Sequence, residues 1–332
     1  MTKSGIGRNL RMALTSVALL AGASLWITPV LAQSYPSKPI EFVVHTSPGG
    51  GTDVFARAVS EMLTREKLLS QPILVANRTG GNGSIAFNFI KSKRGDPHFV
   101  LTVATGTLLT NAARPDLDLG LDNYTPLAFF ALDPQTITVA ADSKFASMKD
   151  LIETGRREPN TLAVAIASAT GTGRLLLYVI ERETGAKFRY VSFKSGSDAA
   201  LAVLGGHVPL TTENLSEMYP QVEAKKLRVL AVTGERRTAV LPDVPTLREL
   251  GYPISIGTGR GFAMPAAVPK EAAAAMEAAL KRVHDSAAWK ENAARNMYES
   301  TFMGSAEFAQ YLAGRREEML GFLVYAGLAP KP

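Results

Sequence analysis

Residues 40–53 read Ile-Glu-Phe-Val-Val-His-Thr-Ser-Pro-Gly-Gly-Gly-Thr-Asp, which indicates a strand, a tight loop and the start of a helix. The β-rich run stops at three consecutive glycines, and a helix-like pattern begins at Val54. Glycines lack the Cβ atom that would keep a ligand away from the backbone. The helix start adds unpaired N–H groups and the positive end of the helix dipole. The segment is therefore typical of a carboxylate or phosphate site.

A nucleotide site finds little support in this loop. The segment lacks the lysine and the Ser/Thr of a Walker A loop. Neither this segment nor the pair Gly81 and Gly83 completes the pattern G-x-G-x-x-G. On these residues alone, a tight turn that needs only backbone freedom stays open as the alternative to a ligand site.

The first residues of the chain have the layout of a secretory signal peptide. Lys3, Arg8 and Arg11 precede an apolar region at 12–27, and Ala32 supplies a small residue before Gln33. We therefore expect a signal peptide at 1–32 with cleavage after Ala32. An uncleaved anchor is the rival interpretation, although the apolar region is short for a membrane span.

Composition excludes several classes of function. The chain has 332 residues and no cysteine, which rules out disulfides, thiolate chemistry, cysteine–zinc sites and lipid attachment through cysteine. Removing 1–32 takes away three basic residues and no acidic one, so the net charge falls from +6 to +3. A nucleic-acid partner thereby loses its main support. We expect a soluble periplasmic protein if the source is Gram-negative.

Strand and helix patterns alternate along the mature chain, which favours an α/β fold. Strands are expected at 40–45, 73–76, 99–104, 125–131, 136–140, 162–167, 188–192, 208–212 and 229–232. Helices are expected at 53–64, 84–91, 147–157, 174–184, 197–204, 215–224, 270–286 and 305–325, with 246–269 irregular. Two such units predict two lobes, each with a mixed or parallel sheet and a cleft between them. Lobe 1 is expected at 33–135 and 258–332, and lobe 2 at 136–257.

No constellation of catalytic residues is visible. The histidines (His45, His98, His207 and His284) have no metal-ligand spacing, and no G-x-S-x-G elbow indicates a serine hydrolase. His45 lies just before the glycine loop, where a structural role is the alternative to ligand contact. Asp53 is a candidate base, but N-capping of the helix fits it at least as well. We therefore predict no catalytic residue, no metal and no cofactor.

Seven segments, in order over the mature chain, carry a family resemblance. They are Tyr35-Pro36-Ser37-Lys38-Pro39-Ile40, Pro48-Gly49-Gly50-Gly51-Thr52-Asp53, Asn77-Arg78-Thr79-Gly80-Gly81-Asn82-Gly83, Leu204-Gly205-Gly206-His207-Val208, Lys226-Leu227-Arg228-Val229-Leu230-Ala231-Val232-Thr233, Leu241-Pro242-Asp243-Val244-Pro245-Thr246 and Pro265-Ala266-Ala267-Val268-Pro269-Lys270. Together they resemble the receptors of tripartite tricarboxylate transporters, the Bug family of periplasmic solute-binding proteins.

This resemblance implies a two-lobed, Venus-flytrap-like protein that delivers a small organic acid to the membrane permease subunits of such a transporter. Family ligands are mostly di- and tricarboxylates, with some amino acids and aromatic acids, held mainly by backbone N–H groups, hydroxyls and water. A monomer without a nucleic-acid partner is expected. Carried over by position, the ligand-binding residues are Ser47, Pro48, Gly49, Gly50, Gly51, Thr52, Asp53, Thr105, Gly106, Thr107, Ala169, Thr170, Gly171, Thr172, Gly173, Ser195, Gly196 and Ser197.

Some positions depart from the family pattern and leave the substrate open. His45-Thr46-Ser47 stands where members often have a proline and an aromatic residue, and the segment 193–198 brings Lys194 and Asp198 near the site. Lys194 or Arg174 could pair a second carboxylate, or each could face solvent. Two other functions stay open: a sensor that presents its bound form to a signalling partner, and an exported carboxylic-acid enzyme, for which no convincing base is present.

Overall fold

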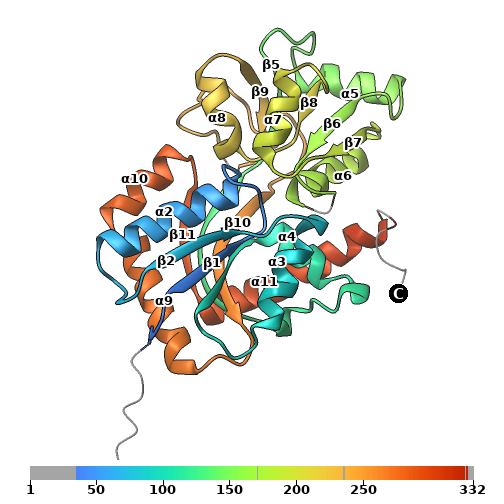
Figure 1. The fold of residues 1–332 in the computed structure, drawn as a ribbon. Coiled ribbons are helices and arrows are strands. Elements are labelled where there is room, and N and C mark those ends of the chain that lie inside the picture. Colours follow the sequence, from blue (N-terminus) through green and yellow to red (C-terminus); the bar gives the residue numbers. More distant parts are fainter. Residues whose placement is uncertain (1–34, 170, 235, 326, 328–332) are drawn as a thin grey trace, which may run out of the picture. The chain divides into compact units, whose positions relative to one another are not determined.

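The computed structural model describes residues 35–169, 171–234, 236–325 and 327. The expected signal peptide at 1–32, its cleavage after Ala32, and Thr170 of the expected ligand site lie outside the described residues. Two mixed sheets with helices on their faces form this part of the chain (Figure 1). No helix in the described ranges is both long and apolar enough to cross a membrane.

The first sheet combines strands from both ends of the described chain. Its strands are β1 (Ile40–Val44), β2 (Ile73–Asn77), β3 (Phe99–Ala104), β4 (Tyr124–Pro134), β10 (Gly257–Pro265) and β11 (Glu299–Gly304). They lie in the order β11-β4-β10-β3-β1-β2. β1 runs parallel to β2 and β3, whereas β10 is antiparallel to β3 and β4. The sheet is therefore mixed, and its parallel part carries the glycine loop that follows β1.

The second sheet is built from the middle of the chain. Its strands are β5 (Thr136–Ala140), β6 (Ala163–Ile166), β7 (Arg189–Ser192), β8 (Leu210–Thr211) and β9 (Leu227–Val232). They lie in the order β7-β6-β8-β5-β9. β6 is parallel to β7 and β8, and β5 is antiparallel to β8 and β9. The chain passes between the two sheets where β4 leads to β5 and where β9 leads to β10.

Helices follow most strands and cover both sheets. The α-helices are α2 (Gly51–Arg65), α3 (Ser84–Ser92), α4 (Thr105–Ala112), α5 (Met148–Arg157), α6 (Thr172–Thr184), α7 (Gly196–Leu204), α8 (Leu215–Glu223), α9 (Lys270–Asp285), α10 (Ala287–Arg295) and α11 (Ser305–Tyr325). The short 3₁₀ turns are η1 (Gly81–Gly83), η2 (Pro115–Leu117) and η3 (Leu121–Asn123).

Each sheet is buried on both faces. Successive side chains of a strand point to opposite faces, so Phe42 of β1 packs with α2, α9 and α10, while Val43 packs with α3, α4 and α11 (Figure 1). In the second sheet, Val164 of β6 packs with α5 and α6, and Ala165 packs with α7 and α8. This double burial explains the nearly continuous apolar runs of the parallel strands.

Four elements, namely β10, α10, β11 and α4, depart from the sequence-based expectation. The region 246–269, expected to be irregular, contains β10, and two further elements, α10 and β11, were not expected. β10 was missed because it reads Gly-Thr-Gly-Arg-Gly-Phe-Ala-Met-Pro, and glycine disfavours strands. Its glycines allow close packing: a Cβ atom on Gly259 would lie 2.5 Å from the ring of Phe129. The expected polar loop at 105–107 is also wrong, since these residues form the first turn of α4.

Candidate ligand-binding site

Five helices begin directly after strands of the two sheets and bring their first turns together. α2 follows β1 and α4 follows β3 in the first sheet, while α6, α7 and α8 follow β6, β7 and β8 in the second. The first turn of each helix presents N–H groups without an intrahelical partner. The carboxyl ends of parallel strands are where α/β folds place their ligands, so these helix starts define the candidate site.

Hydrogen bonds join the loop before α2 to the helices of the second sheet. The hydroxyl of Ser47 donates to Oδ2 of Asp198 at 3.3 Å, and the hydroxyl of Ser197 donates to the carbonyl of Gly49 at 2.9 Å. The N–H of Gly51 donates to Oε1 of Glu217 at 2.8 Å. The glycine loop and the start of α7, both predicted from the sequence, are therefore in direct contact.

Two glycines are required by this close approach. A Cβ atom on Gly51 would lie 2.6 Å from Nη2 of Arg260 and 3.1 Å from the carboxyl carbon of Glu217. A Cβ atom on Gly106 in α4 would overlap the hydroxyl of Thr172 at the start of α6. At both positions the absence of a side chain lets elements of the two sheets meet.

Two adjoining cavities lie among these helix starts. The polar cavity, with a volume of about 630 Å³, is lined by the turn Gly80–Gly83 together with His45, Thr107, Ser168 and Lys194, among others. The buried chamber, of about 50 Å³, is lined among others by Gly51, Thr172, Glu213, Glu217 and Arg260. His45, Thr46, Thr107, Ala167 and Ser168 line both. The chamber is therefore a small inner extension of the polar cavity.

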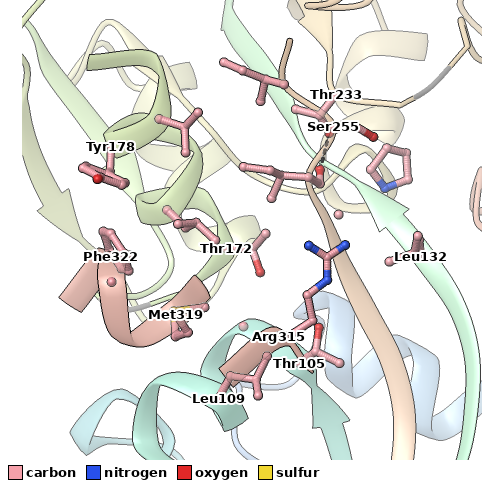
Figure 2. Close-up of a pocket in the computed structure, with 18 of the residues that line it drawn as sticks. Thr105, Leu109, Leu132, Thr172, Tyr178, Thr233, Ser255, Arg315, Met319 and Phe322 are labelled. Carbon is pink, nitrogen blue, oxygen red and sulfur yellow. Dashed lines mark hydrogen bonds between the residues drawn. The ribbon is translucent and has the colours of Figure 1, made fainter. Parts of the chain in front are cut away.

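A third cavity, here called the α11 cavity, has a volume of about 650 Å³ and a different lining. Leu109, Leu132, Met319 and Phe322 supply apolar walls, and the side chain of Arg315 projects toward its middle (Figure 2). Three predicted site residues, Thr105, Gly106 and Thr172, line this cavity.

Charged side chains gather around the buried chamber. Nη2 of Arg260 donates to Oδ2 of Asp133 at 2.5 Å, and Nη1 donates to the hydroxyl of Thr52 at 3.0 Å. Glu213 is buried and accepts from the N–H of Ala167. Glu217 is only partly buried as a residue, but its carboxylate lies inward and also accepts from the N–H of Ser197.

Burial shifts the pKa values of the side chains around the buried chamber. Loss of solvent, reinforced by the nearby charge of Glu217, raises the pKa of Glu213 to about 8, so its carboxyl holds a proton at neutral pH. Burial likewise raises the pKa of Asp133 against the opposing influence of Arg260. Burial lowers the pKa of His45 to about 4, helped by the charge of Arg260, so its ring is neutral. His45 Nδ1 and Arg260 Nε have no hydrogen-bond partner among the described residues.

The predicted site residues fall into three groups. The first group lines the polar cavity or the buried chamber: Gly51, Thr52, Thr107, Gly171, Thr172, Gly173 and Gly196. The second lines the α11 cavity: Thr105, Gly106 and again Thr172. The third, within the described residues, lines none of the three cavities: Ser47, Pro48, Gly49, Gly50, Asp53, Ala169, Ser195 and Ser197.

Several residues of the third group hold the loops in place. Asp53 accepts from the N–H of Gly49 at 2.9 Å, from Arg57 and from Asn77. The N-cap of α2 is Gly50, so Asp53 stands in the first turn and reaches back to the loop. Partial burial of Asp53 is outweighed by these hydrogen bonds, which lower its pKa. Ser195 caps α7 by accepting from Asp198.

Sequence reasoning missed the charged residues of the buried chamber. Asp133, Glu213, Glu217 and Arg260 lie in β4, after β8, in α8 and in β10. The only local signals were an arginine between glycines at 259–261 and two glutamates four residues apart at a helix start. Lys194 lines the polar cavity. The guanidinium of Arg174 lies 4.7 Å from the ring of Tyr190, and none of these three cavities includes it among its described lining residues.

Comparison with known proteins places this geometry in a family. The model of the tripartite tricarboxylate transporter family receptor matches residues 55–321. The protein BugT of Bordetella pertussis is 28% identical over 256 residues, which cover 74% of this chain and 76% of BugT.

Two solved structures share the fold. MatC from Rhodopseudomonas palustris with bound malate is 23% identical, with a TM-score of 0.77 over 86% of this chain and 100% of MatC. An R. palustris protein with adipate is 24% identical, with a TM-score of 0.81 over 90% of this chain and 100% of that protein. These matches and the two mixed sheets confirm the expected α/β fold class.

Proposed function

The chain belongs to the tripartite tricarboxylate transporter receptor family, and on this premise we propose that it captures a small carboxylate between two lobes and delivers it to a permease. Receptors of this family are periplasmic solute-binding proteins and not enzymes. Capture and release therefore constitute the activity, and the chain needs no catalytic base or nucleophile.

The polar cavity is the observation that carries this proposal. Its walls come from both sheets: His45 and the turn Gly80–Gly83 from the first, Ser168 and Lys194 from the second. Helix starts favour anions because their N–H groups and dipoles point outward. Malate and adipate, the ligands of the two structural neighbours, are small carboxylates that a cavity of about 630 Å³ can hold.

We assign the two lobes to the two sheets, with residues 33–135 and 258–332 in lobe 1 and 136–257 in lobe 2. The expected binding residues at 47–53, 105–107, 169–173 and 195–197 would then line or support the cleft between the lobes. Ligand that contacts both lobes favours the closed form in proportion to its differential affinity. The closed form would dock on the permease subunits as a monomer, after export directed by residues 1–32.

A thermal-shift screen of the mature protein against small mono-, di- and tricarboxylates tests the proposal. A ligand that binds the native state raises the melting temperature by mass action, and calorimetry then gives its affinity. Lack of stabilisation by every acid would contradict a carboxylate receptor. Consumption of a bound acid over time would contradict a receptor without chemistry.

A further inference from the structure

The carboxyl group of Glu217 lies where two helices begin. It accepts from the N–H of Gly51 in the first turn of α2, at 2.8 Å, and from the N–H of Ser197 in the first turn of α7. Such N–H groups are the donors that hold a carboxylate ligand at a helix start. A carboxyl group accepts these hydrogen bonds with or without its proton, so the donors are occupied in either protonation state.

The two helix starts also enclose this carboxyl group. A Cβ atom on Gly51 would lie 3.1 Å from the carboxyl carbon of Glu217, and a Cβ atom on Gly196 would lie 2.5 Å from its Oε2. The side chain of Glu217 therefore packs directly against both glycines. A ligand carboxylate could reach the N–H groups of α2 and α7 only by displacing Glu217.

The cation of the buried chamber is also paired within the chain. Among the described residues that line the chamber, Arg260 is the one with a positively charged side chain. Its Nη2 donates to the carboxylate of Asp133, and its Nη1 donates to the hydroxyl of Thr52. A second carboxylate of a ligand would therefore enter the chamber without a partner of its own, which is unfavourable for a buried charge.

Three buried polar atoms of the chamber lining have no hydrogen-bond partner among the described residues: Nδ1 of His45, Oγ1 of Thr46 and Nε of Arg260. The Nε of arginine donates, a hydroxyl donates and accepts, and a neutral imidazole has one donor and one acceptor nitrogen. A hydroxyl or a carboxamide can serve both kinds of partner, whereas a carboxylate only accepts. A chamber of about 50 Å³ has room for a group of this size.

We propose that Glu217 determines the specificity of this receptor by occupying the carboxylate donors of α2 and α7. The ligand then carries one carboxylate, in the polar cavity, and a neutral hydroxyl or carboxamide, in the buried chamber. This inference rests on the proposed function and narrows its substrate class. Lys194 and the turn Gly80–Gly83 line the polar cavity and are at hand for the carboxylate. A dicarboxylate has to displace Glu217 or leave its second carboxylate unpaired.

Calorimetry with matched acids tests the substrate class. Succinate, glutarate and adipate are each compared with their own monoamide, which has nearly the same shape and replaces one carboxylate by a carboxamide. We expect the best-bound monoamide to bind at least roughly tenfold more tightly than its dicarboxylate, because a buried carboxylate without a partner loses its solvation. A dicarboxylate that binds as tightly as its monoamide, or no binding by any of the three pairs, would overturn the inference. The carboxylate receptor stands if any acid of the thermal-shift screen binds, and both fall if none does.

Glu217→Ala tests the role of Glu217 without knowledge of the ligand, because it frees the N–H groups of α2 and α7. At equal ionic strength, we expect sodium acetate to raise the melting temperature of Glu217→Ala more than that of the wild type, since acetate binds the freed donors of the native state. In this variant the preference for the monoamide should also fall to about twofold or less.

Glu223→Ala is the matched control, because Glu223 belongs to the same helix, is exposed and lines none of the three cavities. An equal effect of acetate on the two variants and the wild type would overturn the role of Glu217. If Glu217→Ala does not fold, the comparison of the acids with their monoamides on the unaltered protein still decides.

Discussion

The polar cavity and the α11 cavity have nearly equal volumes, about 630 and 650 Å³, yet their walls differ in kind. The polar cavity is lined by a glycine turn, hydroxyls, an imidazole, a phenyl ring, Lys194 and Asp198, and it adjoins the charged chamber. The α11 cavity combines leucine, isoleucine and aromatic side chains with the charged side chains of Arg182, Glu299, Arg315 and Glu317 (Figure 2). Volume therefore does not identify the binding site. We assign the ligand to the polar cavity because this cavity shares five lining residues with the buried chamber and its charged groups.

The largest expected effect comes from filling the contact at the start of α2. Gly51→Val places a side chain against Arg260 and Glu217. We expect a loss of about 1–3 kcal/mol in the free energy of unfolding, as for other overpacked sites, and loss of measurable ligand binding. Urea unfolding and calorimetry provide the two values. Gly314→Val in α11 serves as control, because a Cβ atom there meets no atom within 4 Å. Normal binding by Gly51→Val would show that this contact is dispensable.

The second effect concerns the proton on Glu213. Its pKa is 4.5 in the unfolded chain and about 8 in the folded one, so the folded state holds a proton that the unfolded state releases. The stability that the protonated carboxyl of Glu213 contributes to the wild type is therefore lost as the pH rises from 4.5 to 8. Glu213→Gln carries no such proton, and we expect its stability relative to wild type to improve by about 1–3 kcal/mol between pH 5 and pH 8.5. If the stability difference between Glu213→Gln and wild type were the same at both pH values, this would contradict the burial of the Glu213 carboxyl.

The third effect has the opposite sign and arises from His45. The unfolded chain binds a proton below pH 6.5, whereas the folded ring stays neutral down to about pH 4. Wild-type stability should therefore fall as the pH drops from 6.5 to 4. His45→Gln should reduce this loss by about 1–2 kcal/mol, measured by urea unfolding at both pH values. If the free energy of unfolding of His45→Gln depended on pH as it does in wild type, this would indicate that the ring of His45 contacts solvent.

The smallest effect compares the two cavities directly. Lys194 lines the polar cavity and Arg315 lines the α11 cavity, and both are exposed. We expect Lys194→Gln to weaken carboxylate binding about three- to tenfold, as befits one exposed charge, and Arg315→Gln to change it less than twofold. Calorimetry with the same acid measures both variants. A larger loss of affinity in Arg315→Gln than in Lys194→Gln would indicate that the ligand binds in the α11 cavity.

Much of the fold was predictable because its signals are local. The strands β1 and β3 and the helices α5 and α11 lie within one residue of their expected bounds. Their apolar periodicity and their caps, such as Ser147 before α5, are readable from neighbouring residues alone. β10 was missed for the converse reason. A glycine-rich strand is stabilised by close packing against Phe129 and Phe308, which lie far away in the sequence.

The glycine loop, the helix start and the family resemblance follow from consecutive residues, because backbone freedom and helix capping act over a few positions. The charged interior of the site does not. Asp133, Glu213, Glu217 and Arg260 come from β4, the connection after β8, α8 and β10, and each looks like an ordinary surface residue in its own segment. Only the tertiary structure removes them from water and places them together. Their altered protonation and the occupation of the glycine loop by Glu217 are therefore consequences of burial, which no local pattern records.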